Sequence, residues 1–255
     1  MITAGIDCGA KTVKVVILKD DKVIGKAIIP AGIDTKKASE EAFEEALKEA
    51  GIKKEDIDKI VATGAGRADQ PFTKDSVTEV SADAKGINFL YPNVHTVIDV
   101  GAEESRAIRV DGKGMVMDFA VNEKCAAGSG AFIEAMARAL EVTVEEIGPL
   151  SLQYKQEIAM NAQCAVFAES ELVTLVHQQT PKPDMARAIH AGISDRIVSM
   201  ARRAGLEPDI AVIGGVAKNP GFIDCLNKDL NTKVIVPDDP EFVGALGAAI
   251  AAKEI

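Results

Sequence analysis

The chain has too few basic residues to bind nucleic acid through its phosphates. Its 29 Lys and Arg against 39 Asp and Glu give a formal net charge of −10 at pH 7. A nucleic-acid partner needs a basic face that displaces counterions, and an anionic membrane surface also attracts basic segments. The sequence therefore predicts neither a nucleic-acid nor a membrane partner.

Long apolar runs, a secretory signal and a disulfide framework are also missing. The longest apolar run, Val243 to Ala252, is too short to cross a bilayer. Strand-like, acid-bearing sequence begins at residue 2, where a signal peptide would stand. The four cysteines then indicate reduced thiols or metal ligands. We expect a cytoplasmic protein.

The P-loop pattern Gly-x-x-x-x-Gly-Lys-Ser/Thr is absent, and a different glycine motif occurs twice. The pattern Ile6-Asp7-Cys8-Gly9-Ala10 recurs 92 residues later as Ile98-Asp99-Val100-Gly101-Ala102, with one residue changed. Each copy leads into an alternating strand with a basic residue, Lys14 or Arg106, and then into a polar turn and a third strand. The repeat predicts two half-sites that face one anion.

The residue types in these turns fit a nucleotide phosphate and its cation. A glycine after a strand lets backbone N–H groups approach a phosphate, and an Asp at the strand end can hold the waters of Mg²⁺. Asp7 and Asp99, from opposite lobes, would share one metal. Alternatively, each motif is only a tight turn capped by Asp. Gly214-Gly215, after a later strand, fits an adenosine contact or an ordinary strand–helix turn.

Hairpins followed by α/β units, all repeated, predict two similar α/β lobes with a nucleotide cleft between them. The first lobe is expected over residues 1–94, completed by a C-terminal helix over 241–255, and the second over 95–240. The small residues of Gly244–Ala248 indicate close helix packing. Expected strands cover 2–6, 12–18, 23–29, 57–62, 98–120 (a hairpin unit), 210–213 and 233–236; expected helices cover 36–50, 76–90, 126–140, 165–177, 185–204 and 242–253, with a short turn at 144–147.

Two cysteines, Cys125 and Cys164, each stand just ahead of an expected helix. The helix N-terminus carries about half a positive charge and lowers a thiol pKa. Two such thiolates can hold one edge of a [4Fe–4S] cluster, which takes four Cys, if the chain dimerises about an axis through it. Alternatively, both are buried structural cysteines. Cys8 and Cys225 are expected to be packing residues.

The motifs together resemble the ATPase superfamily that includes actin, hexokinase and the heat-shock chaperones. Its phosphate-1, phosphate-2 and adenosine motifs match Asp7–Thr12, Asp99–Glu104 and Gly214–Asn219. The resemblance implies two ribonuclease-H-like lobes, the actin-like ATPase fold, with ATP or ADP and Mg²⁺ bound between them.

Further stretches resemble one family within it, the activators of 2-hydroxyacyl-CoA dehydratases and the ATPase subunits of ATP-dependent benzoyl-CoA reductase. They are Cys125-Ala-Ala-Gly-Ser-Gly, Cys164-Ala-Val-Phe-Ala-Glu-Ser-Glu, Thr63-Gly-Ala-Gly-Arg and Tyr91-Pro-Asn-Val-His-Thr-Val-Ile-Asp. The resemblance implies an anaerobic electron-transfer ATPase that forms a homodimer, or a heterodimer with a paralogue. One [4Fe–4S] cluster would be held by Cys125 and Cys164 of each subunit. A donor such as ferredoxin or flavodoxin would supply the electron, and an iron–sulfur acyl-CoA dehydratase or reductase would accept it.

Site roles follow from the matched motifs. Asp7, Asp99, Glu104 and Glu169 are the candidate catalytic residues: the first two near Mg²⁺, Glu104 as a further metal carboxylate, and Glu169 (or Glu171) ordering the attacking water. Arg67 is a candidate for a phosphate or partner contact. The nucleotide is expected to contact Gly9, Ala10, Lys11, Thr12, Gly101, Ala102, Gly214, Gly215 and Lys218.

The sequence departs from the family at two places. Activators usually read Gly-Gly-Gln-Asp at phosphate-2, where this chain has Gly101-Ala102-Glu103-Glu104, and Ser-Cys-His where it has Ser81-Ala82-Asp83. These departures favour, as the alternative function, an ATPase subunit of an ATP-dependent benzoyl-CoA reductase that pairs with a paralogue. A small-molecule kinase on the same fold is the alternative of another class. It would need a catalytic base and a substrate pocket, usually from insertions in a longer chain.

Overall fold

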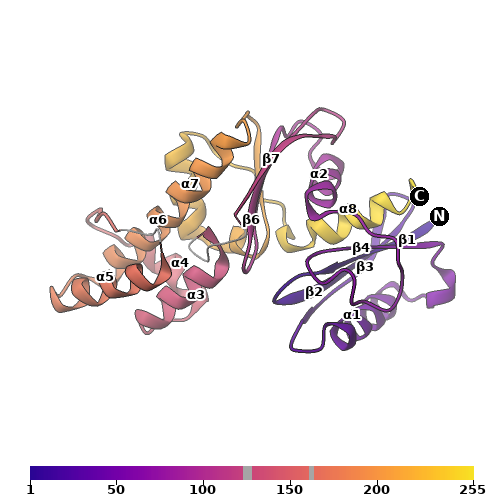
Figure 1. Cartoon of the computed structure of the whole chain (residues 1–255), viewed down its shortest axis with the longest axis horizontal. Helices are drawn as coiled ribbons and strands as arrows, with labels where there is room; N and C mark the ends of the chain where they lie inside the picture. The colour runs from indigo at the N-terminus through magenta and orange to yellow at the C-terminus, as the bar shows by residue number, and fades with distance from the viewer. Residues whose placement is uncertain (123–127, 161–163) are drawn as a thin grey trace. The chain divides into compact units, whose positions relative to one another are not determined.

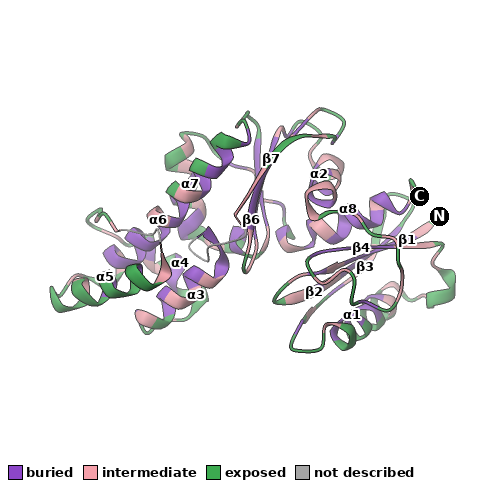
Figure 2. Cartoon of the chain, viewed as in Figure 1, coloured by how far each residue is buried: buried purple, intermediate pink, exposed green. Residues whose placement is uncertain are grey.

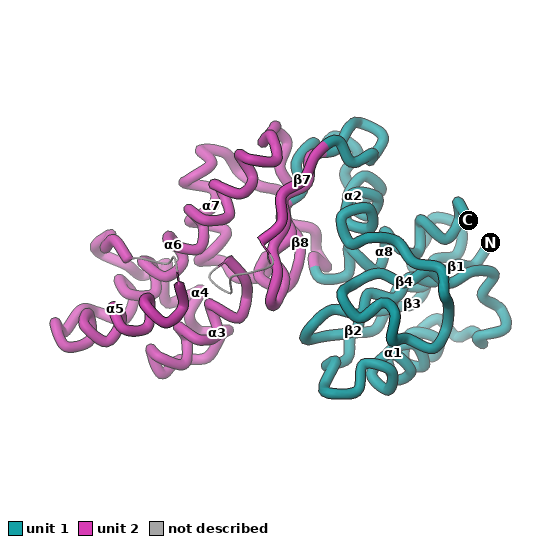
Figure 3. The backbone as a smooth tube through the Cα atoms, in the orientation of Figure 1, with its two compact units in different colours: residues 1–97, 110–117, 241–255 teal, residues 98–109, 118–240 magenta. Residues whose placement is uncertain are grey.

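The structure is a computed structural model that describes residues 1–122, 128–160 and 164–255. The chain divides into two compact units (Figure 3). Unit 1 comprises Met1–Val97, Val110–Met117 and Glu241–Ile255, and unit 2 comprises Ile98–Arg109 and Asp118–Pro240.

Unit 1 is built on a four-stranded sheet in the order β3-β2-β1-β4 (Figure 1). β1 (Ile2–Cys8), β2 (Thr12–Lys19) and β3 (Lys22–Pro30) form an antiparallel meander, and β4 (Lys59–Thr63) pairs in parallel with β1. The register sets Asp7 opposite Lys14. The sheet thus brings the acidic end of the first strand against a basic residue of the second.

Helices cover both faces of this sheet, which is why β2 is buried along nearly its whole length. Side chains alternate along a strand, so Val13, Val15 and Ile17 belong to the core with α1 (Thr35–Ala50), whereas Val16 and Leu18 pack with α8 (Val243–Ala251). The Asp34 carboxylate accepts a hydrogen bond from the Lys37 amide at the start of α1, and Gly51 ends the helix in the left-handed conformation.

α2 (Glu79–Leu90) packs against α8 with backbone touching backbone. A Cβ on Gly86 would lie 2.3 Å from the Val243 carbonyl oxygen, and one on Gly247 would lie 1.7 Å from that of Ala82. No side chain fits at either position. The small residues of Gly244–Ala248 therefore serve close helix packing, as the sequence predicted.

The sheet of unit 2 repeats the topology of the first, in the order β7-β6-β5-β8. Its strands are β5 (Thr96–Val100), β6 (Ser105–Val110), β7 (Val116–Asn122) and β8 (Ile210–Ile213). Position by position, β5 and β8 correspond to β1 and β4. The fold is α/β with two similar halves, as predicted.

In the described part of the chain, five helices accompany the second sheet. They enclose an apolar core that includes Phe132, Met136, Ile189, Ile193 and Phe222. Figure 2 shows that α5 is mostly exposed along its length, unlike the long α6. Their bounds are α3 (Gly130–Ala139), α4 (Val144–Ser151), α5 (Ala165–His177), α6 (Lys182–Arg203) and α7 (Pro220–Leu230). Elsewhere in the chain, short 3₁₀ turns lie at Lys54–Asp56, Gly215–Lys218 and Pro240–Phe242.

The structure differs from the expected elements at several places. α2 begins at Glu79, because Ser76 forms a parallel bridge with Ala62 and Thr78 caps the helix. The expected turn at 144–147 is the first half of α4, which a capping box of Thr143 and Glu146 starts. The strand expected at 233–236 is a single bridge of Ile235 to Ala211 among the described residues. As for membranes, the described helices include none with the length and apolarity of a span.

Candidate functional site

The turn after β1 holds Asp7 in a fixed position. The Gly9 amide donates to the Thr12 carbonyl oxygen at 3.1 Å and closes the turn. Lys14 Nζ donates to Asp7 Oδ2 at 3.0 Å, and each of these side chains is 14% exposed. Ala10 and Lys11 form the exposed tip between them. The turn therefore presents backbone and a cation to solvent while its carboxylate stays largely buried.

The turn after β5 repeats this geometry in unit 2. The Gly101 amide donates to the Glu104 carbonyl oxygen at 2.9 Å. Arg106 donates from one terminal nitrogen to Asp99 Oδ2 at 2.8 Å and from the other to Glu104 Oε2 at 2.8 Å. The guanidinium thus holds two carboxylates through its two terminal nitrogens. Glu104 is tied to Arg106, and its role toward a metal stays a prediction.

A glycine follows the strand beside each aspartate, and in both units it lies against that carboxylate. Gly64, with φ +91°, has no room for a Cβ, which would be 2.6 Å from Asp7 Oδ1. Gly214, with φ +84°, is equivalent, since its Cβ would be 2.4 Å from Asp99 Oδ1. Both positions need the left-handed region and close backbone approach, which only glycine supplies.

The equivalence of Gly64 and Gly214 was missed by sequence reasoning, which treated Thr63–Arg67 and Gly214-Gly215 as unrelated motifs. The available signal was positional, because each glycine directly follows the strand beside the Asp-bearing strand. Arg67 braces the first of these turns by donating to the Gly64 carbonyl oxygen at 3.0 Å. Its expected phosphate or partner contact stays a prediction.

The adenosine motif is open to solvent beyond Gly214. Gly215 is exposed, and a Cβ placed there would meet nothing within 4 Å. Lys218, at the end of the 3₁₀ turn, is exposed as well. A ligand can therefore reach this loop without a rearrangement of side chains.

The structure separates the described cysteines into two kinds. Burial raises the pKa of the Cys8 thiol to about 11 and that of Cys225 to about 12. Both are buried, which confirms the prediction that they are packing residues, although Cys8 ends β1 instead of lying in the turn. Cys164 is partly exposed at the N-cap of α5. Cys125 lies within 123–127, outside the described residues.

The helix that follows Cys125 begins on the second phosphate turn. The amides of Gly130 and Ala131 donate to the carbonyl oxygens of Gly101 and Ala102 at 2.9 and 2.8 Å. A Cβ on Gly130 would lie 3.3 Å from the Gly101 oxygen, so little slack remains. Any displacement of Gly101 and Ala102 is therefore transmitted to the start of α3.

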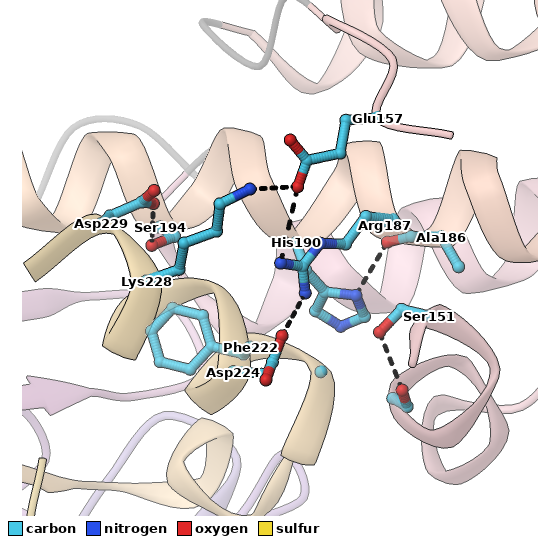
Figure 4. Close-up of polar contacts among 12 residues, drawn as sticks. Ser151, Glu157, Ala186, Arg187, His190, Ser194, Phe222, Asp224, Lys228 and Asp229 are labelled. Carbon is cyan, nitrogen blue, oxygen red and sulfur yellow. Dashed lines mark hydrogen bonds and ion pairs between the residues drawn. The ribbon is translucent and has the colours of Figure 1, made fainter. Parts of the chain in front are cut away.

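An ion network centred on the buried Arg187 holds residues 154–157 (Figure 4). Arg187, 3% exposed on α6, pairs with Asp224 of α7 at 2.5 Å and with Glu157 at 3.9 Å. Lys228 of α7 pairs with the same Glu157, and the guanidinium lies 4.4 Å from the centre of the Tyr154 ring. Figure 4 shows these charges converging between α6 and α7. The segment at 154–157 is thus anchored to the helix that follows the adenosine motif.

Unit 2 also contains a cavity of about 670 Å³ beside α6. Arg196, Met200 and Arg203 of the helix line it, together with Ser105 and Asn122 of the sheet. Its described lining contains none of the residues expected to touch nucleotide.

The donor groups in these turns fit the cofactors that the sequence implies. Asp7 and Asp99 are oxygen donors of the kind that Mg²⁺ takes, beside cradles at Gly64 and Gly214 that a Cβ would fill. Of the two predicted cluster ligands, Cys164 lies in the described part of the chain, where it combines partial exposure with a helix N-terminus, as suits a thiolate ligand. Among the described residues, which do not include Cys125, no group of three or more His, Cys, Asp or Glu gathers as a metal site.

Two sheets of one topology, each with an Asp-x-Gly turn and a glycine beside its carboxylate, define an ATPase of the actin-like fold. The chain belongs to the BadF/BadG/BcrA/BcrD ATPase family, whose profile matches residues 4–252. It is 40% identical to the activator of lactoyl-CoA dehydratase from Anaerotignum propionicum, over all of this chain and 98% of that protein.

Two solved structures of activators share the fold closely. Component A of the Acidaminococcus fermentans (R)-2-hydroxyglutaryl-CoA dehydratase is 36% identical, with a TM-score of 0.96 over 100% of this chain and 98% of the other. The activator of the 2-hydroxyisocaproyl-CoA dehydratase from Clostridium difficile, solved with bound ADPNP, is 34% identical, with a TM-score of 0.93 over 100% and 95%. Family and fold resemblance predicted from the sequence are confirmed.

Proposed function

We propose that this ATPase is an iron–sulfur electron-transfer protein of the 2-hydroxyacyl-CoA dehydratase activator type. It hydrolyses ATP and drives a low-potential electron into a partner acyl-CoA enzyme. The names of the relatives support the partner class. The observation that carries the coupling is the pair of hydrogen bonds that seats the start of α3, just after Cys125, on the phosphate turn at Gly101 and Ala102.

The nucleotide would be bound by the paired turns, with one half-site in each lobe (residues 1–94 with 241–255, and 95–240). Backbone N–H groups at Gly9, Ala10, Gly101 and Ala102 would approach the phosphates. Lys11 and Thr12 supply a charge and a hydroxyl, and the adenosine side would lie along Gly214, Gly215 and Lys218. Asp7 and Asp99 would hold the waters of Mg²⁺, which supplies positive charge against the phosphates.

The remaining carboxylates, Glu169 and Glu104, have separate roles in hydrolysis. Glu169 is exposed on α5, within two turns of Cys164, and would orient the attacking water. Glu104 lies in the second phosphate turn, is fixed by Arg106, and would serve the metal as a further carboxylate. ATP and water give ADP and phosphate, and the loss of the γ-phosphate relaxes the turn that α3 rests on.

The electron path is assigned to the two cysteines ahead of the helices. Cys125 and Cys164 of two subunits would supply the four thiolates of one [4Fe–4S] cluster, which when bound provides one-electron transfer at low potential. α5, behind Cys164, exposes Val166, Phe167, Val173 and Val176, an apolar strip of the kind that protein partners cover. A ferredoxin or flavodoxin would reduce the cluster again after each transfer. Nucleotide can bias the transfer only if the partner binds the nucleotide states differently.

Anoxic purification followed by iron analysis tests the proposal. We expect a brown dimer with about four irons, bleached by Cys125→Ser or Cys164→Ser and left coloured by Cys8→Ala and Cys225→Ala. Reduced protein with ATP should reduce an acyl-CoA dehydratase, and ADP should not support it. A colourless monomer that phosphorylates a sugar would contradict the proposal and favour the kinase alternative.

The second candidate is an ATPase subunit of an ATP-dependent benzoyl-CoA reductase that pairs with a paralogue. Glu103-Glu104 in the second phosphate turn is the feature that favours it. Co-purification under anoxia separates the two: a two-chain dehydratase indicates an activator, and a larger complex with a second ATPase subunit indicates the reductase.

A further inference from the structure

Asp83 is a buried carboxylate that the nucleotide motifs leave unexplained. It lies on α2 and is 4% exposed, in the Ser81-Ala82-Asp83 stretch that departs from the Ser-Cys-His of activators. An acidic side chain is rarely buried this deeply unless it is engaged. Its surroundings therefore indicate what it serves.

Asp83 and Asp7 both lie beside Gly244. A Cβ on Gly244 would lie 3.2 Å from Asp83 Oδ1 and 3.7 Å from Asp7 Oδ2. One oxygen of each carboxylate is thus within 4 Å of the same point, and no side chain stands there. The two carboxylates come from α2 and β1, which are distant in sequence.

Close backbone contacts fix this approach. α8 is pressed against α2 through Gly247 and against β1 through Gly5, whose Cβ would lie 2.0 Å from the Ala245 carbonyl oxygen. Helix, helix and strand therefore cannot slide apart by a side-chain rearrangement. Asp83 is held beside Asp7 by packing, which is how a positioning group is kept in place.

Positive charge in unit 1 offsets the repulsion between the carboxylates of Asp83 and Asp7. Two neighbouring carboxylates repel one another unless cations compensate them. Lys14 Nζ lies 3.0 Å from Asp7 Oδ2, and Gly244 is in the first turn of α8, where the helix carries about half a positive charge. A hydrated divalent cation at Asp7 would add charge on the same side.

We propose that Asp83 is a positioning residue for the cation that Asp7 holds: its carboxylate accepts a hydrogen bond from a water of the hydrated ion. Mg²⁺ keeps several of its waters in proteins, and groups that bind such waters orient them. The inference rests on the proposed function, because it presumes that a divalent cation accompanies ATP at Asp7.

Manganese binding tests the inference with a readout that does not depend on turnover. The hydrated Mn²⁺ signal in electron paramagnetic resonance gives the free ion concentration during titration of protein saturated with a non-hydrolysable ATP analogue. Asp83→Asn should weaken Mn²⁺ binding about tenfold or more, the usual effect of losing an outer partner of a metal. ADP affinity in EDTA should stay within about twofold.

Gly244→Ala provides an independent variant, because its methyl group would enter the space between the carboxylates while leaving both in the chain. It should weaken Mn²⁺ binding in the same direction, and it carries the test if Asp83→Asn does not fold. Asp21→Asn is the matched control, since its side chain is 81% exposed in the β2–β3 turn. Mn²⁺ affinity within about twofold of wild type in the folded variants overturns the inference. A wild-type protein that binds neither the analogue nor Mn²⁺ overturns the proposed function instead.

Discussion

Arg106 holds Asp99 as Lys14 holds Asp7, at the same step of two repeated sheets. The nitrogen–oxygen distances are 2.8 and 3.0 Å, and both pairs join the end of one strand to the next strand. Arg106 and Asp99 are the more buried pair, with side chains 7% and 12% exposed. A duplicated ion pair thus fixes the carboxylate of each half-site.

Loss of Arg106 should destabilise unit 2 sharply. Arg106→Met leaves the buried Asp99 carboxylate without this cation, and breaking a buried pair in this way costs about 3 kcal/mol. Urea unfolding measures the change. Arg106→Lys should cost less, because unit 1 uses a lysine at this position, and Arg138→Met, at an exposed site on α3, should stay within about 0.5 kcal/mol of wild type. Equal losses for Arg106→Met and Arg138→Met would show that the pair does not hold Asp99.

Gly214 and Gly215 should respond differently to alanine although they are neighbours. Gly214→Ala forces a Cβ to 2.4 Å from Asp99 at a positive φ, so the melting temperature should fall by several degrees. Gly215→Ala meets nothing, so its melting temperature without nucleotide should match wild type.

The same two variants also test the adenosine contact. If the nucleotide approaches Gly215 closely, Gly215→Ala should lose most of the thermal shift that ADP gives the wild type. An unchanged ADP shift in Gly215→Ala would place the adenosine elsewhere.

Much of the geometry of the two Asp-x-Gly turns could be predicted because their motifs are local. An Asp, a glycine and a basic residue within eight positions determine a turn and its ion pair, as at Asp7 and Lys14. The partnership of Asp83 with Asp7 could not be predicted, because it depends on α8, residues 243–251, packing onto α2 and β1. The strand expected at 233–236 is a single bridge at Ile235, because a short apolar run does not by itself distinguish a strand from a bridge.

Alkylation should separate the thiols of the iron-free protein. The raised pKa values of Cys8 and Cys225, about 11 and 12, leave about one thiolate in a thousand or fewer at pH 8, and both side chains are buried. Iodoacetamide should modify Cys164 at least tenfold faster in the native state, as measured by peptide mass spectrometry. In urea, Cys8 and Cys225 should react like ordinary thiols. Fast native labelling of Cys225 would contradict its burial between α6 and α7.

Removing Arg187 should loosen the stretch that leads to Cys164. Arg187→Leu leaves Asp224 and Glu157 without the guanidinium that joins them. Hydrogen exchange should therefore rise in residues 154–157, where Lys155 and Gln156 donate their amides to Asp184. Arg202→Leu, at an exposed position of the same helix, is the control. Unchanged protection at 154–157 in Arg187→Leu would mean that the contacts with Asp184 and Lys228 hold the segment without Arg187.

His190 should make stability depend on pH between about 4 and 6.5. It is fully buried on α6, and burial lowers its pKa from 6.5 to about 4, although Nδ1 contacts the Ala186 carbonyl oxygen at 2.8 Å. Within this window the unfolded chain binds a proton that the folded chain does not. The folded state therefore loses stability as pH falls through it, by at most about 1.4 kcal/mol per unit, and the contribution is fully present above 6.5.

Urea unfolding of the iron-free protein at several pH values between 4.5 and 7 measures this loss. His190→Gln should lower stability at pH 7, because a tightly packed ring is replaced, yet it should flatten the fall toward acid. His177→Gln removes an exposed histidine of α5 and should leave the slope as in wild type. If the two variants keep the same slope as wild type, other groups govern the acid sensitivity, and the imidazole of His190 is protonated in the folded protein as readily as in the unfolded chain.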